Sequence, residues 1–255
     1  MAKTREAPAF EIKGLKTTYP IYVETPPEAS AGGEAATGPW ITVLCLDGDD
    51  QFEDLRKARQ VLAKTEEVKL PPLLLVGIGY GASYGKPGNQ RVRDYSPVPL
   101  LEEGGAGGEA DAFLEFLKGT VWPELEKRYR VDPEIRGVAG YSLGALFALH
   151  ALFKPEPFFN RVLAASPSVW WGERAVLNAV TAVQDQKIPL RAKLFVSVGL
   201  KDSKSMVGDL DMLEAQLEAR PVQELHVSRA RFPEHNHFNA IAVSFRMGLA
   251  ELFGA

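Results

Sequence analysis

A serine flanked by two glycines, in the stretch "GYSLG" (residues 140–144), stands between the strand-like "IRGVA" and the helix-like "ALFALHALF". A G-x-S-x-G sequence between a strand and a helix is typical of a nucleophile elbow, because the glycines permit a cramped turn that exposes the serine hydroxyl. The free amides of the helix that follows favour negative charge beside that hydroxyl. The pattern predicts that Ser142 is a nucleophile, the alternative being a structural serine in a glycine-rich turn.

A serine nucleophile requires a base that removes its proton. The chain has four histidines. His150 lies about two turns further along the helix that follows the serine, too far to return to it, and His226 lies inside a predicted strand. His235 and His237, in "PEHNHFNA" after the last predicted strand, therefore remain as candidates for the base, in the chain order Ser, acid, His.

The acid that orients the histidine is expected in the loop after the strand "AKLFVSVG". Asp202 occupies that loop, three residues after Gly199. Asp209 is the second candidate, but it lies on a predicted helix where a solvated charge is the ordinary reading. A Ser–His pair without an acid is the remaining alternative.

Two backbone amides are expected to hold the oxyanion of a tetrahedral intermediate. One is that of Leu143, next to the serine, and the other that of Asp49, in the "DGDDQF" loop after the strand "WITVLCL". The alternative for this loop is an acidic turn or a calcium site, but it lacks the ligand pattern of an EF-hand. We therefore predict no metal and no cofactor.

Apolar runs that alternate with helical patterns must position these residues. Short continuous apolar runs at 40–46 and 72–79 are typical of strands that are covered on both faces, as in a parallel sheet. The alternation predicts one α/β domain over residues 1–255, a three-layer sandwich whose mostly parallel central sheet carries helices on both faces. We further predict strands within 10–26, loops at 26–39 and 80–108, and a helix over 109–130 that is bent or interrupted near Pro123.

Composition narrows the possible partners and the location of the chain. Its 255 residues are 45% hydrophobic and 24% charged, with a formal net charge of −4 and no long basic run, which argues against nucleic acid and anionic membranes as partners. No signal peptide and no apolar run of roughly 20 residues is visible. Cys45 is the single cysteine, so no intrachain disulfide can form, and we expect a cytoplasmic protein. The sequence makes no prediction of the oligomeric state.

A set of motifs extends over nearly the whole chain: "LDGDDQF", "VGIGY", "RVRDYSPVP", "EADAFLEFL", "GYSLGALFALHAL", "FNRVLAASPSVWW" and "PEHNHFNAI". In these motifs the chain resembles the putative-esterase family of α/β hydrolases, close to the enterobactin and bacillibactin (siderophore) esterases. The resemblance implies the α/β-hydrolase fold, Ser142 as nucleophile, and His237 as base through "HNHF". A similar "DG" stretch in related mycolyltransferases supports the amide of Asp49. Tyr141 and Ala145 depart from the family pattern, in which His and Gly are frequent there.

These residues together predict a serine carboxylic-ester hydrolase that acts on a small-molecule ester. Ser142 would attack the carbonyl, His237 would transfer the proton, Asp202 would orient His237, and water would release the acyl group. A siderophore-type lactone or another bulky ester is the narrower expectation. The alternatives are an acyltransferase with the same site, in which an alcohol replaces the water, and a non-catalytic binding protein on the same fold.

The substrate pocket is expected where "SPSVWW" (166–171) and the 80–108 segment meet, at the carboxyl edge of the sheet. Trp170, Trp171, Tyr84 and Tyr95 supply broad aromatic surfaces suited to an acyl or aryl group, although either tryptophan could instead be core. Arg93 is expected to bind substrate, with a structural ion pair to Asp94 as its alternative. The cations that could attract an anionic ester are Arg91, Arg93, Lys201 and Lys204.

Overall fold

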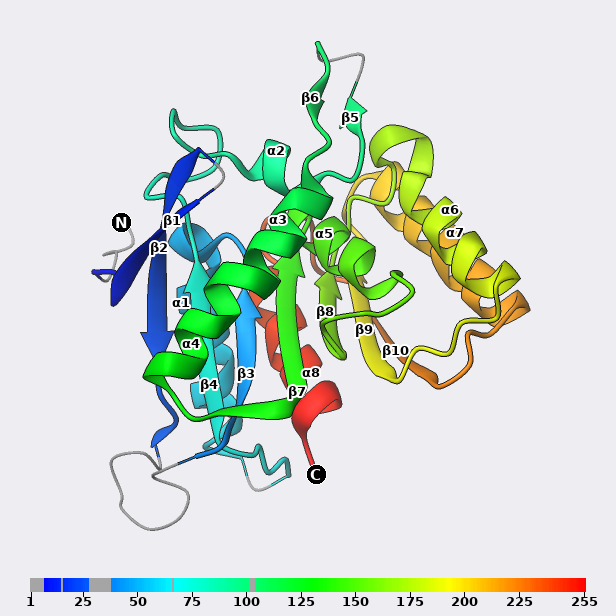
Figure 1. The fold of residues 1–255 in the computed structure, drawn as a ribbon. Coiled ribbons are helices and arrows are strands. Elements are labelled where there is room, and N and C mark those ends of the chain that lie inside the picture. Colours follow the sequence, from blue (N-terminus) through cyan, green and yellow to red (C-terminus); the bar gives the residue numbers. More distant parts are fainter. Residues whose placement is uncertain (1–6, 15, 28–37, 66, 101–103) are drawn as a thin grey trace.

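An eight-stranded sheet forms the centre of the computed structural model, which describes residues 7–14, 16–27, 38–65, 67–100 and 104–255 (Figure 1). The strands lie in the order β1-β2-β4-β3-β7-β8-β9-β10. β2 pairs antiparallel with β1 and β4, and the neighbours from β4 to β10 pair in parallel. The strands are β1 (Phe10–Gly14), β2 (Thr17–Glu24), β3 (Trp40–Cys45), β4 (Leu73–Ile78), β7 (Val131–Tyr141), β8 (Arg161–Ala165), β9 (Ala192–Gly199) and β10 (Leu225–Phe232).

Helices cover both faces of this sheet, which confirms the predicted three-layer α/β arrangement (Figure 1). They are α1 (Gly48–Leu62), α2 (Arg91–Tyr95), α3 (Ala110–Phe116), α4 (Trp122–Arg128), α5 (Leu143–Leu152), α6 (Trp171–Asp185), α7 (Lys204–Ala219) and α8 (Ile241–Phe253). α1 and α8 pack together on one face, and α3 to α7 cover the other.

Two hydrophobic cores, one on each face, follow from the alternation of side chains along the parallel strands. In β3, Val43 and Cys45 belong to the core beneath α1 and α8, whereas Leu44 belongs to the core beneath α3 to α7. α5 is buried along its whole length, which explains why its sequence is apolar all round. The buried α5 holds the elbow serine rigidly against the sheet.

The helix expected over 109–130 is interrupted near Pro123 as predicted, by a π-helical turn, η4 (Leu117–Val121), that joins α3 to α4 just before the proline. The next segment is more regular than the sequence indicated. The segment 80–108 contains α2 and a small hairpin of β5 (Pro99–Leu100) and β6 (Ala106–Gly107), although residues 101–103 lie outside the described part of the chain. Most of the loop predicted at 26–39 also lies outside it.

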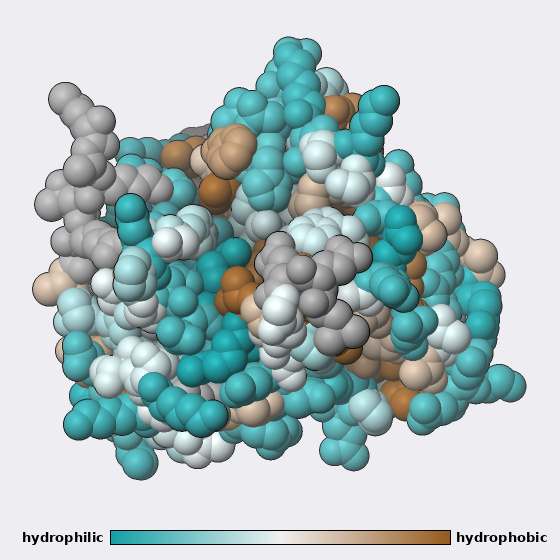
Figure 2. Space-filling model, turned by 90° about the horizontal axis from the view of Figure 1, so that it is seen from above, coloured by the Kyte–Doolittle hydropathy of each residue, from teal (hydrophilic) through white to brown (hydrophobic). Residues whose placement is uncertain are grey.

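The carboxyl ends of β3, β7, β8 and β9 meet at one edge of the sheet, and the loops that follow them carry the candidate site residues. Figure 2 looks onto the molecule from above; hydrophilic residues cover most of this face, with smaller hydrophobic areas between them. Within the described ranges, no helix combines the length and the apolar character needed to cross a membrane.

Candidate active site

Ser142 occupies a strained turn between β7 and α5. Its φ of 58° and ψ of −117° lie in a region that residues other than glycine rarely adopt. A Cβ atom on Gly140 would lie 2.4 Å from the backbone of Gly144, so a glycine is required at that position. The backbone N–H of Ser142 donates to Ala165 O in β8 (3.0 Å), which fixes the turn to the neighbouring strand. Gly140 thus has the steric role expected of a glycine in a nucleophile elbow.

Ser142, His237 and Asp202 form one hydrogen-bonded chain, although they come from loops far apart in the sequence. His237 Nε2 lies 3.1 Å from Ser142 Oγ, and His237 Nδ1 lies 2.8 Å from Asp202 Oδ2. The Asp202 side chain is only 4% exposed, whereas that of His237 is 28% exposed and open to a substrate. The arrangement lets the imidazole accept the serine proton on one nitrogen while the carboxylate accepts a hydrogen bond from the other.

The two loops that carry the histidine and the acid are tied to each other. Lys201 N donates to His235 O (2.9 Å), and a Cβ on Gly199 would approach the same carbonyl to 2.3 Å. The hydroxyl of Tyr141, beside the serine, donates to His237 O (2.8 Å). Tyr141, where the family often has histidine, therefore positions the backbone of the histidine loop.

His235, the other candidate base, packs against the end of β10. Its ring meets Phe232 edge-on, with ring centroids 5.7 Å apart. Its Nδ1 is buried and has no hydrogen-bond partner among the described residues. Of the two histidines left open by the residue pattern, His237 is the one that contacts Ser142.

Leu143 and Asp49, the two predicted oxyanion donors, stand at helix N-termini. Leu143 is the first residue of α5 and Asp49 the second residue of α1, so the amides of both lack a carbonyl partner within their helices. The Asp49 carboxylate accepts hydrogen bonds from the Tyr22 hydroxyl (2.7 Å), Tyr80 N and Gly81 N (3.1 Å). These contacts fix the first turn of α1 against the chain after β4.

A buried ion pair beside the elbow was not predicted. Asp47 has a positive φ of 53° at the start of α1 and is 1% exposed. Its Oδ1 and Oδ2 accept from Arg91 Nε (2.9 Å) and Nη2 (3.0 Å). Burial raises the pKa of the Asp47 carboxyl and Arg91 opposes that shift. The carboxylate packs against the elbow, since a Cβ on Gly144 would lie 3.1 Å from Asp47 Oδ2. The "RVRDY" motif indicated that arginines matter here and suggested Asp94 as a partner, but it did not reveal that Arg91 pairs with Asp47.

Three residues expected in the substrate pocket have other positions. Tyr95 is fully buried, and its hydroxyl accepts from Asp47 N (3.0 Å). Trp171 is 4% exposed and donates its indole N–H to Val98 O (2.8 Å). Arg93 donates to Asp94 (2.6 Å) and to the Tyr19 hydroxyl (3.0 Å), which is the structural alternative considered for it. Tyr95 and Trp171 are packed in the core, and Arg93 is paired with Asp94. The expectation that these three side chains bind substrate is therefore corrected.

Trp170 and Tyr84 remain accessible, each 39% exposed. Ser168 was not predicted: its Oγ lies 3.3 Å from Ser142 Oγ, and its N–H donates to Ser142 O (3.1 Å). The motif "SPSVWW" could have indicated that Ser168 lies near the nucleophile, because it follows a strand that ends at the same edge of the sheet as Ser142.

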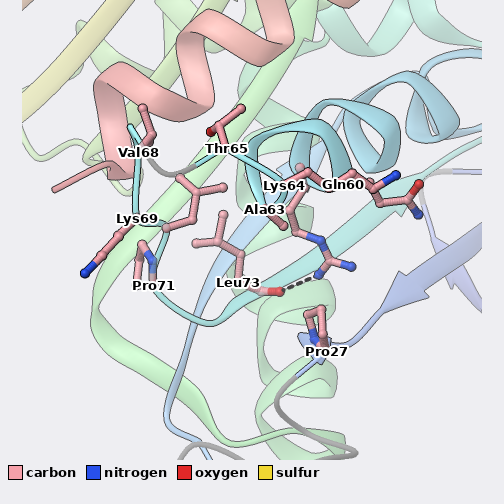
Figure 3. A pocket seen from close by; sticks show the side chains of 11 residues that line it. Pro27, Gln60, Ala63, Lys64, Thr65, Val68, Lys69, Pro71 and Leu73 are labelled. Carbon is pink, nitrogen blue, oxygen red and sulfur yellow. Dashed lines mark hydrogen bonds between the residues drawn. The ribbon is translucent and has the colours of Figure 1, made fainter.

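A pocket of about 630 Å³ at the opposite edge of the sheet is unrelated to these residues (Figure 3). Its lining comes from the end of α1, the segment before β4 and Pro27, and Arg59 in its wall donates to Leu73 O (3.2 Å). None of the catalytic candidates lines it. The candidate catalytic residues lie instead in the loops at the carboxyl edge of the sheet.

Comparison with known proteins agrees with the geometry. The family model described as "Putative esterase" matches residues 13–246. The ferri-bacillibactin esterase BesA of Bacillus subtilis is 25% identical over 96% of this chain and 82% of its own length. A siderophore enterobactin esterase of Emericella nidulans is 32% identical over 68% of this chain and 61% of its own length.

The crystal structure of the BES protein from Bacillus cereus has the same fold, with a TM-score of 0.85 at 22% identity over 99% of this chain and 98% of that one. The chain therefore belongs to the putative esterase family and is a serine esterase with the α/β-hydrolase fold.

Proposed function

We propose that this esterase hydrolyses bulky small-molecule esters of the siderophore-lactone type, with Ser142 as nucleophile, His237 as base and Asp202 as the acid that orients His237. The observation that carries the proposal is the chain of contacts from Ser142 Oγ to His237 Nε2 (3.1 Å) and from His237 Nδ1 to Asp202 Oδ2 (2.8 Å). The strained backbone of Ser142, which presents the hydroxyl at the sheet edge, supports the same assignment.

Acylation and deacylation follow from this geometry. His237 Nε2 takes the hydroxyl proton as Ser142 Oγ attacks the ester carbonyl, and the amides of Leu143 and Asp49 bind the oxyanion. Collapse of the tetrahedral intermediate breaks the ester C–O bond, and the leaving alkoxide receives the proton from His237. A water molecule then attacks the acyl-enzyme, gives its proton to His237, and the acid is released as Ser142 recovers that proton.

The siderophore part of the proposal is supported by the names of the relatives, which act on bacillibactin and enterobactin. The exposed Trp170, two residues after the Ser168 that contacts Ser142, offers an aromatic surface for the bulky part of such an ester. The proposed partner is therefore a small ester, with no cofactor in the reaction.

A panel of substrates tests the proposal. We expect wild-type enzyme to hydrolyse p-nitrophenyl esters and to open a catechol-siderophore trilactone. Chromatography of the linear products measures the opening of the lactone. Adding a small alcohol distinguishes hydrolysis from acyl transfer, because a transferase would form the new ester at the expense of the free acid. Folded enzyme that opens no lactone but cleaves simple esters would contradict the siderophore assignment alone.

A further inference from the structure

Ser168 brings a buried hydroxyl to the site, and the mechanism described above does not use it. The residue follows β8, is 3% exposed, and places its Oγ 3.3 Å from Ser142 Oγ. Within the described part of the chain, this contact is the only hydrogen bond of the Ser168 side chain. A buried hydroxyl keeps at least one partner, and here that partner is the oxygen of the proposed nucleophile.

Backbone hydrogen bonds hold the Ser168 hydroxyl beside the elbow. Ser168 N donates to Ser142 O (3.1 Å), and Ser168 O accepts from Trp171 N (3.1 Å). Ser142 N donates in turn to Ala165 O at the end of β8 (3.0 Å). Because none of these bonds uses the Ser168 side chain, a substitution that removes the hydroxyl keeps the backbone contacts of the elbow.

The hydrogen atoms around Ser142 Oγ determine which serine is the donor. An ionised carboxylate only accepts, so His237 Nδ1 carries the hydrogen in its contact with Asp202 Oδ2 (2.8 Å), and Nε2 of the neutral ring is left as an acceptor. The single hydrogen of Ser142 Oγ is directed to His237 Nε2 (3.1 Å). The hydrogen between the two serine oxygens therefore belongs to Ser168, which donates to Ser142 Oγ.

The strength of this hydrogen bond changes as the reaction proceeds. Ser142 Oγ is a good acceptor in the free enzyme, but a weak one in the acyl-enzyme, where its electrons are delocalised into the ester carbonyl. It becomes a strong acceptor as it leaves the acyl carbon and gains negative charge. An interaction accelerates a step only if it is stronger in the transition state than in the state before it. The Ser168 donor meets this condition in deacylation, whereas in acylation it is already engaged beforehand.

We propose that Ser168 is a further catalytic residue, which promotes deacylation by donating a hydrogen bond to Ser142 Oγ as the bond from this oxygen to the acyl carbon breaks. Water adds to the acyl carbon and gives its proton to His237. His237 returns that proton to Ser142 Oγ, and Ser168 keeps its own proton throughout. This inference rests on the proposed roles of Ser142 and His237.

The reagent p-nitrophenyl N,N-dimethylcarbamate separates the two steps, because a carbamoylated serine forms with release of p-nitrophenolate and is hydrolysed slowly. The rate of p-nitrophenolate release in the first turnover measures acylation. After the reagent is removed, intact-mass spectrometry follows the return of the carbamoylated chain to its free mass, which measures deacylation. Peptide mass spectrometry locates the carbamoyl group.

In Ser168→Ala we expect deacylation to be about three- to tenfold slower, the effect of losing one hydrogen bond, and acylation to stay within about twofold of wild type. Ser168→Cys keeps a weaker donor and should lie between wild type and Ser168→Ala in deacylation. Ser244→Ala is the matched control: it removes a different buried serine–serine hydrogen bond, donated by Ser197 Oγ (3.0 Å), and should change neither step.

Equal slowing of both steps in Ser168→Ala would show a structural role alone and overturn the inference, as would unchanged deacylation. If circular dichroism shows that Ser168→Ala does not fold, the same two rates in Ser168→Cys decide by the same criteria. Failure of the proposed function gives a different result: wild-type protein would then acquire no carbamoyl group on Ser142, and the role of Ser168 would fall with it.

Discussion

At the scale of single residues, the distances from Ser142 distinguish between two candidate bases, His235 and His237, that are only two positions apart in the sequence. His237 Nε2 is 3.1 Å from Ser142 Oγ, whereas His235 packs its ring against Phe232. We expect His237→Ala to lower kcat by about 10³-fold or more, because no other group can take the serine proton, and His235→Ala to change it only a few-fold. Steady-state kinetics on one p-nitrophenyl ester measure both, and the opposite ranking would show that His235 is the base.

The two adjacent tryptophans also have different surroundings at this scale. Trp170 is 39% exposed, and Trp171 is 4% exposed with its indole N–H bound to Val98 O. We expect Trp170→Ala to change the ratio of kcat/KM between bulky and short esters by about 10- to 200-fold.

Trp171→Ala serves as the matched comparison, and it should lower the free energy of unfolding by about 3–5 kcal/mol and leave the ratio unchanged. An unchanged ratio in Trp170→Ala, with only a lower melting temperature, would place Trp170 in the core as well.

At the scale of elements, α2 holds the start of α1 through the Asp47–Arg91 pair, and α1 carries the proposed oxyanion amide of Asp49. Arg91→Leu leaves a buried carboxylate without its partner, which costs about 3–5 kcal/mol of folding free energy. We expect kcat to fall to a similar degree for all esters, because the oxyanion loop loses its support.

Arg91→Lys, which keeps the charge but loses the bidentate contact, should lie between wild type and Arg91→Leu in both stability and kcat. Adding Asp47→Asn to Arg91→Leu should recover part of the lost melting temperature, because it removes the unpaired charge. A change in substrate ranking without loss of kcat would instead show that Arg91 contacts the substrate.

Sequence patterns predicted the elements better than they predicted contacts between elements. The strands, the elbow at Ser142 and the loop of Asp202 could be read from local apolar runs and glycine spacing, because those signals are local. The pairing of Asp47 with Arg91 depends on two segments that meet only in the folded chain, so the motif "RVRDY" pointed to Arg93 and Tyr95 instead. Burial of Tyr95 and Trp171 likewise depends on tertiary packing.

At the scale of the whole molecule, a buried histidine far from the site links stability to pH. His150 on α5 is 8% exposed, and burial lowers its pKa below the ordinary 6.5, with Lys154 contributing and Asp111 opposing. Between that lowered pKa and 6.5 the unfolded chain binds more protons than the folded one, so stability falls as pH falls through this window.

We therefore expect the melting temperature of wild type to drop between about pH 7.5 and about pH 5.5, and to drop less in His150→Gln, which cannot be protonated. Equal drops in both proteins would show that other groups govern this pH range.

Reaction with a fluorophosphonate probe tests the central claim, that Ser142 is an activated nucleophile, most directly. Intact-mass and peptide mass spectrometry should find one probe per chain on Ser142 in wild type and none in Ser142→Ala, which should also lose on the order of 10⁴- to 10⁶-fold in ester hydrolysis while keeping its melting temperature. Labelling at another residue, or more than a tenth of wild-type turnover in Ser142→Ala, would contradict the account.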